Sequence, residues 1–516
     1  MKKFAKHIVQ LLLWAFLSSG FAFSQVQVST AELWNKPDAI FFKKNRNALM
    51  QLLPPKSVAV FFSEDPDFYY LTGCKLQNAM LLVFKEPEKF QNVIQNEFLF
   101  IPEPTTQQKS GYEYMLPIEW IQKFSGINTV LYHQDFFKSD FSAKKYDKTL
   151  YNPQYAYSPI ANQAKKHFDT ENATNPVLKR YLAKLQDVNF ENFVKLIKPE
   201  IISALEYYPE LRNSELLLLS LQVKNAVEWE GLQKRITQYN TDIYSLSDFM
   251  NYLRQIKDEN EIFLIKKATN IANVCLLDML KLTASNTWEY EVASAGSFYI
   301  QKYGALPSYP IEVASGENSL LLKYTQNHKK IRENEWVRLN VGVNYAGWHG
   351  VTVRTIPANA KFTENQKKVY QAVYKAHQAA LNKCTSNQTF NAPQEAAMEV
   401  LKNEFFSLGI IKKSEDLRKY VFEEVCQYIG TSYPETGLYT VLKPQQAITV
   451  SVSLYIPPKS DCDVKWWNTG IKLTDTVIVT DTGNQNLSNS VPKSISELEN
   501  IVLQKPLLNV KVPSIE

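Results

Sequence analysis

The sequence predicts two domains, an N-terminal mixed α/β domain and a C-terminal α+β domain with antiparallel strands. Three observations lead to this fold class. The length of 516 residues is more than one ordinary hydrophobic core accommodates. In the N-terminal half, a helical segment is followed by short apolar runs that aspartate, proline and glycine separate. In the C-terminal half, Val337–Pro357 has the pattern of a strand, a tight turn and a returning strand.

Residues 1–24 have the pattern of a secretory signal. Three lysines precede an apolar run, Ile8–Phe23, which ends next to Ser24. A membrane anchor is the alternative, but polar residues interrupt the run, and it is shorter than the ~20 residues that span a bilayer. We therefore expect cleavage near Ser24 and export to the periplasm or the outer membrane of a bacterium.

Composition and charge describe a globular chain without a nucleic-acid partner. Hydrophobic residues make up 45 % of the chain, which suffices for packed cores. Loss of the three lysines of the signal lowers the formal net charge from +5 to +2, and no basic stripe follows. No later apolar stretch is long enough to span a bilayer, so no transmembrane segment is expected after cleavage.

The cysteines do not form a disulfide framework. They are odd in number, widely spaced and without a CxxC pair: Cys74, Cys275, Cys384, Cys426 and Cys462. We expect mostly buried free thiols. Pairing of some of them in an exported chain stays open.

The N-terminal half is expected to begin with a helix and to continue with strands. The helix is predicted over Ala39–Leu53. After Pro54 and Pro55, four short apolar runs predict strands: Val58–Phe62, Phe68–Leu71, Met80–Phe84 and Phe98–Ile101.

The middle of the chain predicts helices and loops. Residues 142–240 are irregular, contain a leucine cluster at Leu216–Leu221, and are expected to include an insertion. A helical segment, Leu253–Lys267, has isoleucines at helical spacing and is expected to pack on a sheet. The predicted boundaries are a signal (1–24), an N-terminal domain with insertions (25–248), a C-terminal domain (249–490) and a tail (491–516), polar and then extended.

Two segments resemble a known family. Ser63–Gly73 (SEDPDFYYLTG) is similar to the DFxYLTG signature of the aminopeptidase P N-terminal domain. Val337–Pro357 resembles the first metal hairpin of the aminopeptidase P, creatinase and methionine aminopeptidase group. Four further stretches match that group in order: Ser308–Asn327, Phe422–Gly430, Thr449–Pro458 and Thr469–Ser488. The resemblance implies a creatinase-like N-terminal domain and a "pita-bread" C-terminal domain, with a curved antiparallel sheet flanked by helices.

The resemblance also assigns the positions of the family's site residues. Its metal ligands, two aspartates, a histidine and two glutamates, fall at Asn340, Val351, Gln427, Ser451 and Thr474. Three further family histidines fall at Lys323, Glu423 and Pro434. Matching residues flank these positions, so an alignment slip that restored one ligand would break its neighbours.

The replaced positions conflict with the family's chemistry. Two divalent ions about 4 Å apart, bridged by an activated water, require anionic oxygen ligands. The five residues present carry no charge, and Val351 has no donor atom. The sequence therefore predicts no metal, no cofactor and no metal-dependent hydrolysis at these positions.

Other residues near these positions offer rival sites. His349 could act as a ligand, although a lone histidine in a strand is more often structural. Cys426 could act as a nucleophile with His349 as its base, and the alternative is a packed thiol. Glu423, Glu424 and Glu435 could gather a metal, and the alternative is a solvated acidic rim.

Four aromatic residues are candidates for a peptide groove. They are Tyr309, Trp348, Trp466 and Trp467. The alternative is that they pack loops.

These observations lead to a prediction of function with rivals. We expect an exported, non-catalytic pseudopeptidase that is not an enzyme and acts as a binding or scaffold subunit of an envelope complex. A protein partner or a homodimer is expected, and an extended peptide is a further candidate ligand. The alternative is an Xaa-Pro aminopeptidase that removes residues before proline. A metal-free hydrolase of the creatinase type is disfavoured, because creatinases use a histidine that is absent at the family positions.

Overall fold

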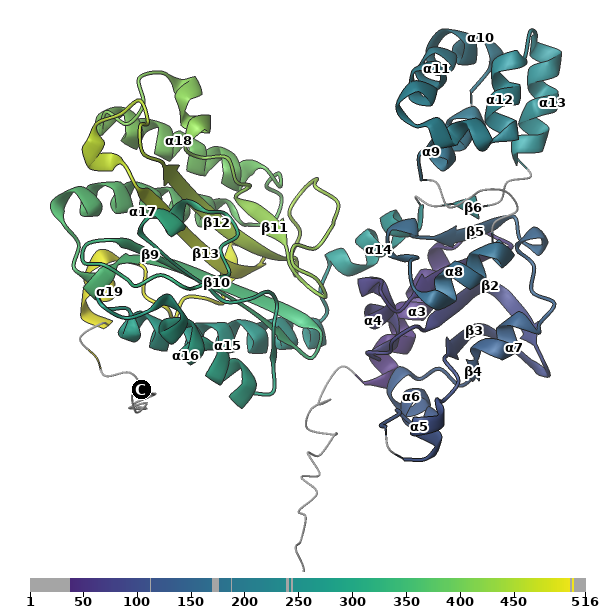
Figure 1. Ribbon diagram of the computed structural model, residues 1–516, viewed down its shortest axis with the longest axis horizontal. Coiled ribbons are helices and arrows are strands. Elements are labelled where there is room, and N and C mark those ends of the chain that lie inside the picture. Colours follow the sequence, from purple (N-terminus) through teal and green to yellow (C-terminus); the bar gives the residue numbers. More distant parts are fainter. Residues whose placement is uncertain are drawn as a thin grey trace, which may run out of the picture.

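The computed structural model describes residues 38–111, 113–168, 176–186, 188–237, 241–242, 245–501 and 504. The predicted signal and its cleavage position lie outside the described residues. Figure 1 shows an N-terminal part, in purple to teal, beside a C-terminal part, in green to yellow. The predicted fold class, a mixed α/β domain followed by an α+β domain with an antiparallel sheet, is confirmed.

The N-terminal domain is built on a mixed six-stranded sheet. Its strand order is β4-β3-β2-β1-β5-β6, with antiparallel pairing among β1, β2 and β3 and parallel pairing elsewhere. The strands are β1 (Ser57–Phe62), β2 (Met80–Phe90), β3 (Val93–Ile101), β4 (Val130–Tyr132), β5 (Lys148–Tyr151) and β6 (Thr241–Asp242). Helices surround this sheet: α3 (Ala39–Leu52), α4 (Pro66–Thr72), α5 (Thr106–Lys109), α6 (Ile118–Ser125), α7 (His133–Phe137) and α8 (Pro159–Phe168).

One predicted strand of this domain is wrong. Residues Phe68–Leu71 lie in helix α4, not in a strand. The Asp65 side chain accepts a hydrogen bond from the Asp67 amide, Pro66 begins the helix, and Gly73 ends it in the left-handed conformation. A run of four apolar residues fits a strand or a buried helix equally well, and here the capping residues decide.

The predicted insertion is a separate helical unit between β5 and β6. It consists of α9 (Pro176–Gln186), α10 (Phe190–Asn192), α11 (Lys198–Tyr207), α12 (Glu215–Gln222) and α13 (Ala226–Thr237). The leucine cluster lies on α12, and the unit has its own hydrophobic core around Phe193 and Trp229. Figure 1 shows this unit beyond the edge of the N-terminal sheet.

The segment predicted as one helix, Leu253–Lys267, belongs to two helices. Helix α14 (Ser245–Gln255) ends within this segment, at Gln255, and α15 (Glu259–Leu282) begins after Asp258. The Asp258 side chain accepts hydrogen bonds from the Asn260 and Glu261 amides and so caps α15. The break lets α14 pack on α3 while α15 crosses the C-terminal sheet.

The C-terminal domain contains the eight-stranded sheet on which the site lies. Its strand order is β11-β12-β13-β10-β9-β7, with β8 paired to β9 and β14 to β13. The strands are β7 (Leu306–Pro307), β8 (Glu312–Ser315), β9 (Trp336–Tyr345), β10 (Trp348–Pro357), β11 (Cys426–Tyr428), β12 (Ala447–Ile456), β13 (Thr469–Val479) and β14 (Asn484–Asn486). The described pairings are all antiparallel, and the predicted hairpin is confirmed as β9 and β10.

Helices cover one face of this sheet. Helices α15 and α16 (Glu289–Lys302) and helices α17 (Glu364–Lys383) and α18 (Ala392–Ser407) pack around one large core. That core includes Leu339 and Val341 of β9 and Leu473 of β13. Because side chains alternate along a strand, Asn340 and Thr474 point to the opposite face, which we call the site face.

The end of the described chain differs from the expected extended tail. Residues Ile495–Ile501 form helix α19, with Leu498 in the C-terminal core. Within the described ranges, no helix is long and apolar enough to span a membrane.

Buried contacts join the two domains. The Tyr69 hydroxyl donates to the Ala346 carbonyl at 2.7 Å, and the Arg254 guanidinium pairs with Asp67 at 2.8 Å. Glu435 accepts from the Lys257 ammonium at 2.5 Å, so charges of both domains meet in one network. Burial would raise the pKa of Glu435, but the neighbouring Lys257 and Arg254 hold this pKa below its ordinary value.

Candidate functional site

The sheet register aligns three of the five assigned ligand positions in one row. Asn340 on β9 lies opposite Val353 on β10, which lies opposite Thr474 on β13, and Thr474 lies opposite Ser451 on β12. Directly paired residues of an antiparallel sheet point to the same face. The structure therefore brings Asn340, Ser451 and Thr474 together on the site face, where the resemblance expects ligands.

The two remaining positions lie next to this row. Val351 is two residues from Val353 on the same strand and is fully buried on the same face. Gln427, on β11, lies opposite Thr449, which is two residues before Ser451. All five positions are thus neighbours in the sheet, as the alignment of the motifs predicts.

Hydrogen bonds within the site face occupy the donor atoms of this row. The hydroxyls of Ser451 and Thr474 are 2.6 Å apart and bond to each other. The Tyr309 hydroxyl donates to Asn340 Oδ1 at 2.6 Å, and Asn340 Nδ2 donates to Glu312 Oε2 at 3.0 Å. These polar side chains therefore satisfy one another without an ion.

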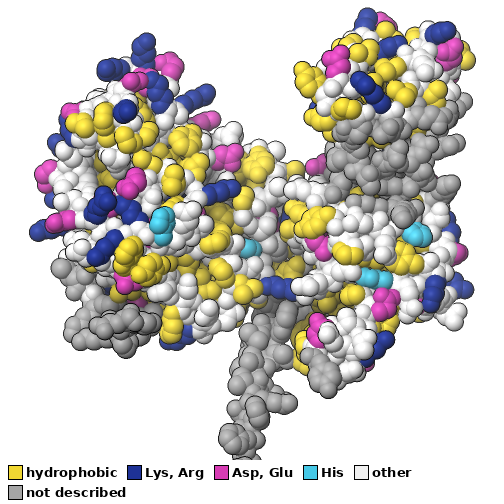
Figure 2. Space-filling model, viewed as in Figure 1, with side chains coloured by type: hydrophobic (Ala, Val, Ile, Leu, Met, Phe, Trp, Pro, Cys, Tyr) yellow, Lys and Arg dark blue, Asp and Glu magenta, His cyan; other side chains and the backbone are white. Residues whose placement is uncertain are grey.

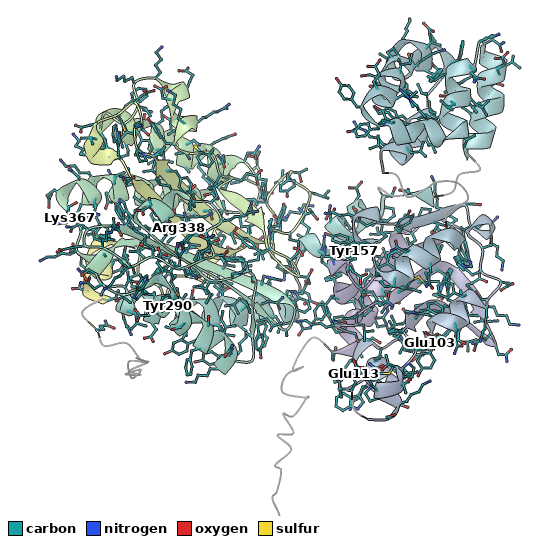
Figure 3. All side chains as sticks on the ribbon, viewed as in Figure 1. Glu103, Glu113, Tyr157, Tyr290, Arg338 and Lys367 are labelled. Atoms are coloured by element: carbon teal, nitrogen blue, oxygen red, sulfur yellow. The ribbon has the colours of Figure 1, made fainter. Side chains whose placement is uncertain are left out.

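Glu312 connects this row to a cation. The carboxylate lies 3.6 Å from the Arg338 guanidinium, two residues before Asn340 on β9. Burial raises the pKa of Glu312, and the Asn340 amide and Arg338 offset part of that rise. In Figure 3, Arg338 lies among the strands of the sheet, whereas Lys367 and Tyr290 lie at the edge of the domain.

A second ion pair lies beside Ser451 and Thr474. Lys472 Nζ on β13 is 2.7 Å from Glu423 Oε1, and the Tyr455 hydroxyl donates to Glu423 Oε2 at 2.5 Å. Burial would raise the pKa of Glu423, but Lys472 and the hydroxyls of Tyr455 and Ser453 hold it below the ordinary value. Glu423, at a position of a family histidine, is therefore a charged partner of Lys472.

The other two positions of family histidines are exposed. Lys323 lies at the surface in the segment before β9, and Pro434 lies at the surface in the loop after β11. Neither side chain adds a buried donor to the row.

The residues at the five assigned ligand positions do not fit a pair of divalent cations. Four bridging or terminal carboxylates and an imidazole are replaced by amides, hydroxyls and a valine, so no ligand charge balances the ions. Among the described residues, no group of three or more His, Cys, Asp or Glu side chains could hold a metal.

His349 and Cys426, the residues of two rival sites, have structural surroundings. His349 Nδ1 lies 2.7 Å from the Ser308 hydroxyl, and His349 Nε2 lies 3.0 Å from Asn344 Nδ2, so both ring nitrogens are engaged. Burial lowers the pKa of His349 to about 4. The neighbouring Cys384 and burial raise the pKa of the Cys426 thiol well above its ordinary value, which disfavours the thiolate that a nucleophile requires.

The acidic trio does not form a solvated rim. Glu435 is buried in the network between the domains, Glu423 is paired with Lys472, and only Glu424 is exposed. The expectation of a solvated rim for all three is wrong, because cations far away in the sequence fold against two of them.

The four aromatic candidates do not line one groove. Trp348 is buried between the domains, where its ring lies 5.9 Å from those of Phe41 and Tyr69. Trp466 and Trp467 line a surface cavity of about 420 Å³, and its other lining residues are 316, 317, 332, 334–336, 363, 365, 366, 369, 465, 468 and 469. Of the four, only Tyr309 contacts the row, through Asn340.

Sequence reasoning missed four residues of the site face. They are Glu312, Arg338, Tyr455 and Lys472. A signal was present for Arg338 and Lys472, which stand two residues before Asn340 and Thr474, because that spacing puts side chains on one face of a strand. Nothing local to Glu312 and Tyr455 indicated their partners.

The fold and the site face define a two-domain peptidase architecture. The family model for metallopeptidase family M24 matches residues 264–481, and the model for the aminopeptidase P N-terminal domain matches residues 42–151. The chain belongs to the aminopeptidase P family of metallopeptidases.

Relatives and solved structures agree with this assignment. The chain is 26 % identical to an Xaa-Pro aminopeptidase of Escherichia coli over 290 residues, which cover 53 % of this chain and 66 % of the relative. It is 23 % identical to intermediate cleaving peptidase 55 of Saccharomyces cerevisiae over 92 % of this chain and 86 % of that protein. Among solved structures, the low-pH form of Escherichia coli aminopeptidase P matches with a TM-score of 0.69 and 21 % identity, over 91 % of this chain and 99 % of that chain. This structural similarity shows that the two chains share a fold.

The match to bacterial relatives is partial in length. The matched segment spans 64 % of the Xaa-Pro aminopeptidase of Haemophilus influenzae and 51 % of this chain, at 26 % identity. Less than two thirds of these first relatives is therefore covered.

The prediction of a chain that is not an enzyme is contradicted by these comparisons. The bacterial relatives are named Xaa-Pro aminopeptidases, a further relative is named intermediate cleaving peptidase 55, and a structural neighbour is aminopeptidase P; these names are those of enzymes. The five replaced residues exclude one way of holding metal, but they do not by themselves decide activity. An inactive subunit of an envelope complex finds no support in the comparisons.

Proposed function

We propose that this chain acts on the N-terminal end of peptides that have proline as their second residue. The observation that carries the proposal is the whole aminopeptidase P fold, matched over 91 % of the chain, with the family's site positions in register on one sheet face. The relatives' names specify Xaa-Pro peptides. One structural neighbour of the same fold is aminopeptidase P from Escherichia coli with the inhibitor Pro-Leu.

The site face carries charges of both signs that suit a peptide end. Glu312 and Glu423 are anionic partners for an ammonium group, and Arg338 and Lys472 are cationic partners for a carboxylate or carbonyl group. Arg338 Nε is buried without a hydrogen-bond acceptor in the described structure, so it is a free donor at this face. These residues would bind and orient the peptide, and the proposal assigns no step to a metal.

Peptide binding tests this proposal directly. We expect Pro-Leu and an Xaa-Pro-Xaa tripeptide to bind the full-length chain saturably in titration calorimetry. Turnover is assayed in parallel. Mass spectrometry monitors release of the first residue of the tripeptide, with and without added Mn²⁺. The variant Lys472→Ala should weaken binding about tenfold, because one charge-assisted bond is lost.

A lysine far from the site face supplies the control. Lys402 pairs with Glu399 at the surface of α18, so Lys402→Ala removes an ion-paired lysine without touching the site face. Its affinity for Pro-Leu should equal that of the unmodified chain. No saturable binding, or equal weakening in both variants, would reject the proposal.

We propose, second, that the helical unit of α9 to α13 binds a protein partner. Leu196 and Tyr207 are 60 % and 77 % exposed there, and Figure 2 shows hydrophobic side chains on the visible surface of that unit. Exposed apolar side chains gathered on one unit are typical of interaction sites.

Capture of partners tests this second proposal. The double variant Leu196→Glu and Tyr207→Ser should lose a stoichiometric partner that the unmodified chain retains from envelope fractions in mild detergent. Ile94→Glu, an equally exposed position on β3, is the control and should retain it. A chain recovered alone from envelope fractions would count against the partner.

A further inference from the structure

A surface cavity of about 420 Å³ lies where helix α17 begins. Four segments that are distant in the sequence form it: residues 316 and 317 after β8, residues 332 and 334–336 at the start of β9, the first turns of α17, and residues 465–469, which lead into β13. None of the five assigned ligand positions lines this cavity. Its volume lies in the range of pockets that hold small organic ligands.

Hydrogen bonds fix these segments to one another. Gln366 Nε2 in the first turn of α17 donates to the Asn334 carbonyl at 2.9 Å, and Gln366 Oε1 accepts from the Thr363 amide at 3.0 Å. The Arg332 amide donates to Glu335 Oε2 at 3.0 Å and so closes the turn before β9. The cavity is therefore part of the folded domain and needs no rearrangement to form.

Aromatic side chains form the walls of the cavity. The Trp336 ring is stacked on the Tyr370 ring of α17, with the ring centroids 6.4 Å apart. Trp336 and Trp466 are buried, whereas Trp467 is half-buried, and Val369 adds an aliphatic group to the lining. Indole and aliphatic surfaces of this kind favour a ligand with an apolar body.

One of these indoles has an unused hydrogen-bond donor. Trp466 is 2 % exposed, and its Nε1–H has no acceptor among the described residues. The neighbouring Trp467 differs, because its Nε1 donates to the carbonyl oxygens of Ser460 and Cys462 at 3.2 and 3.1 Å. A buried N–H without an acceptor is unfavourable, and such groups are rare in folded proteins. Since Trp466 lines the cavity, a ligand with an acceptor atom would relieve this cost.

Positive charge and further donors surround the same cavity. Arg332 lines it, and within the described ranges the guanidinium has no ion-pair partner. Helix α17 begins after Thr363 and has 20 residues, so the N–H groups of Glu364 and Asn365 have no acceptor within the helix. This end of a helix carries a partial positive charge. Arg332, Trp466 and the helix thus present donors from three segments.

Carboxylates near the cavity are already paired. Lys329 Nζ lies 2.7 Å from both Glu335 carboxylate oxygens and 3.2 Å from Glu317 Oε2. Lys465 Nζ lies 5.2 Å from the centroid of the neighbouring indole ring and 3.0 Å from Asp463 Oδ2. The acidic groups around the cavity therefore have cations of their own, and the donors named above stay without partners.

We propose that this cavity binds a small organic carboxylate with an aromatic or aliphatic body. The carboxylate accepts hydrogen bonds from the Arg332 guanidinium, the Trp466 indole and the first turn of α17, and the body packs on Trp467 and Val369. A carboxylate accepts several hydrogen bonds, and bonds that involve charged groups are about twice as strong as neutral ones. It therefore satisfies three donors at once, which an uncharged ligand of the same shape does not.

Calorimetric titration with benzoate tests the proposal, with benzamide as an uncharged ligand of nearly the same shape. We expect benzoate to bind the full-length chain with a dissociation constant of about 1 mM or lower, and benzamide to bind at least about tenfold more weakly. Equal affinities for the two, or no saturable binding of benzoate, would overturn the proposal. N-acetylphenylalanine separates two sources of a carboxylate. Affinity at least equal to that of benzoate assigns the ligand to a peptide C-terminus, and weaker binding assigns it to a small free acid.

Variants locate the bound carboxylate. Arg332→Ala should lower the affinity for benzoate about tenfold, whereas Arg418→Ala, which removes another exposed arginine outside the cavity, should leave it unchanged. Trp466→Phe removes the unused donor, and Trp467→Phe removes one that is already bonded, so the preference for benzoate over benzamide should fall only in Trp466→Phe. This preference is a ratio measured within one variant, so it is informative even where a variant is less stable. A preference unchanged in both Arg332→Ala and Trp466→Phe would contradict the proposal.

Discussion

The substitution Asp475→Asn should destabilise the C-terminal domain by about 3–5 kcal/mol at pH 7. Asp475 is fully buried, 2.8 Å from the Arg354 guanidinium and 2.6 Å from Lys493 Nζ. An asparagine keeps the shape and leaves two buried cations without their anion. Urea unfolding of the C-terminal transition, followed by intrinsic fluorescence, measures the loss.

The stability that Asp475 contributes should depend on pH. Burial would raise the pKa of Asp475, but Arg354 and Lys493 hold it far below its ordinary value. A carboxyl whose native pKa is depressed contributes its stability above its unfolded pKa, about 4, and loses it as the pH falls toward the native pKa. The stability difference between the unmodified chain and Asp475→Asn should therefore be largest at neutral pH and shrink in acid.

An exposed carboxylate gives the matched control. Glu399 pairs with Lys402 on the surface of α18, where the charge is well hydrated. Glu399→Gln should leave the free energy of unfolding nearly unchanged, because the ion pair is exposed to solvent. Equal effects at the two positions would show that the buried network does not stabilise the domain.

Restoring the family's ligands should create a metal centre on the site face. The variant Asn340→Asp, Val351→Asp, Gln427→His, Ser451→Glu and Thr474→Glu supplies four carboxylates and one imidazole at adjacent register positions. It should take up two Mn²⁺ per chain and bind them at least about 1,000-fold more tightly than the unmodified chain. Elemental analysis and calorimetry measure the stoichiometry and the affinity.

The stability of this variant should depend on the metal. Val351 and Thr474 are buried, so carboxylates there repel each other until cations bind, and the melting temperature should rise with added Mn²⁺. A control with Val351→Asn, Ser451→Gln and Thr474→Gln changes the volume without adding charge and should show no such rise. Two tightly bound ions on the site face of the unmodified chain would refute the electrostatic reasoning.

Local patterns predicted much of the fold because strands and caps leave strong signals. The hairpin Val337–Pro357 and the strands near Thr449–Pro458 and Thr469–Ser488 appear where expected. Residues Phe68–Leu71 were misassigned, because a short apolar run does not distinguish a strand from a capped helix. The site positions Asn340, Ser451 and Thr474 came from motif register, and the sheet places them together.

Motifs in the chain suffice to identify the residue types at the family's site positions and the two domains that carry them. The pairing of charges on the site face emerges only on folding, since Glu312 meets Arg338 and Glu423 meets Lys472 through the path of the chain. The position of Trp348 between the domains, next to Phe41, likewise emerges only on folding. Periodicity and capping act between neighbouring residues, whereas ion pairs and aromatic contacts depend on which distant segments fold side by side.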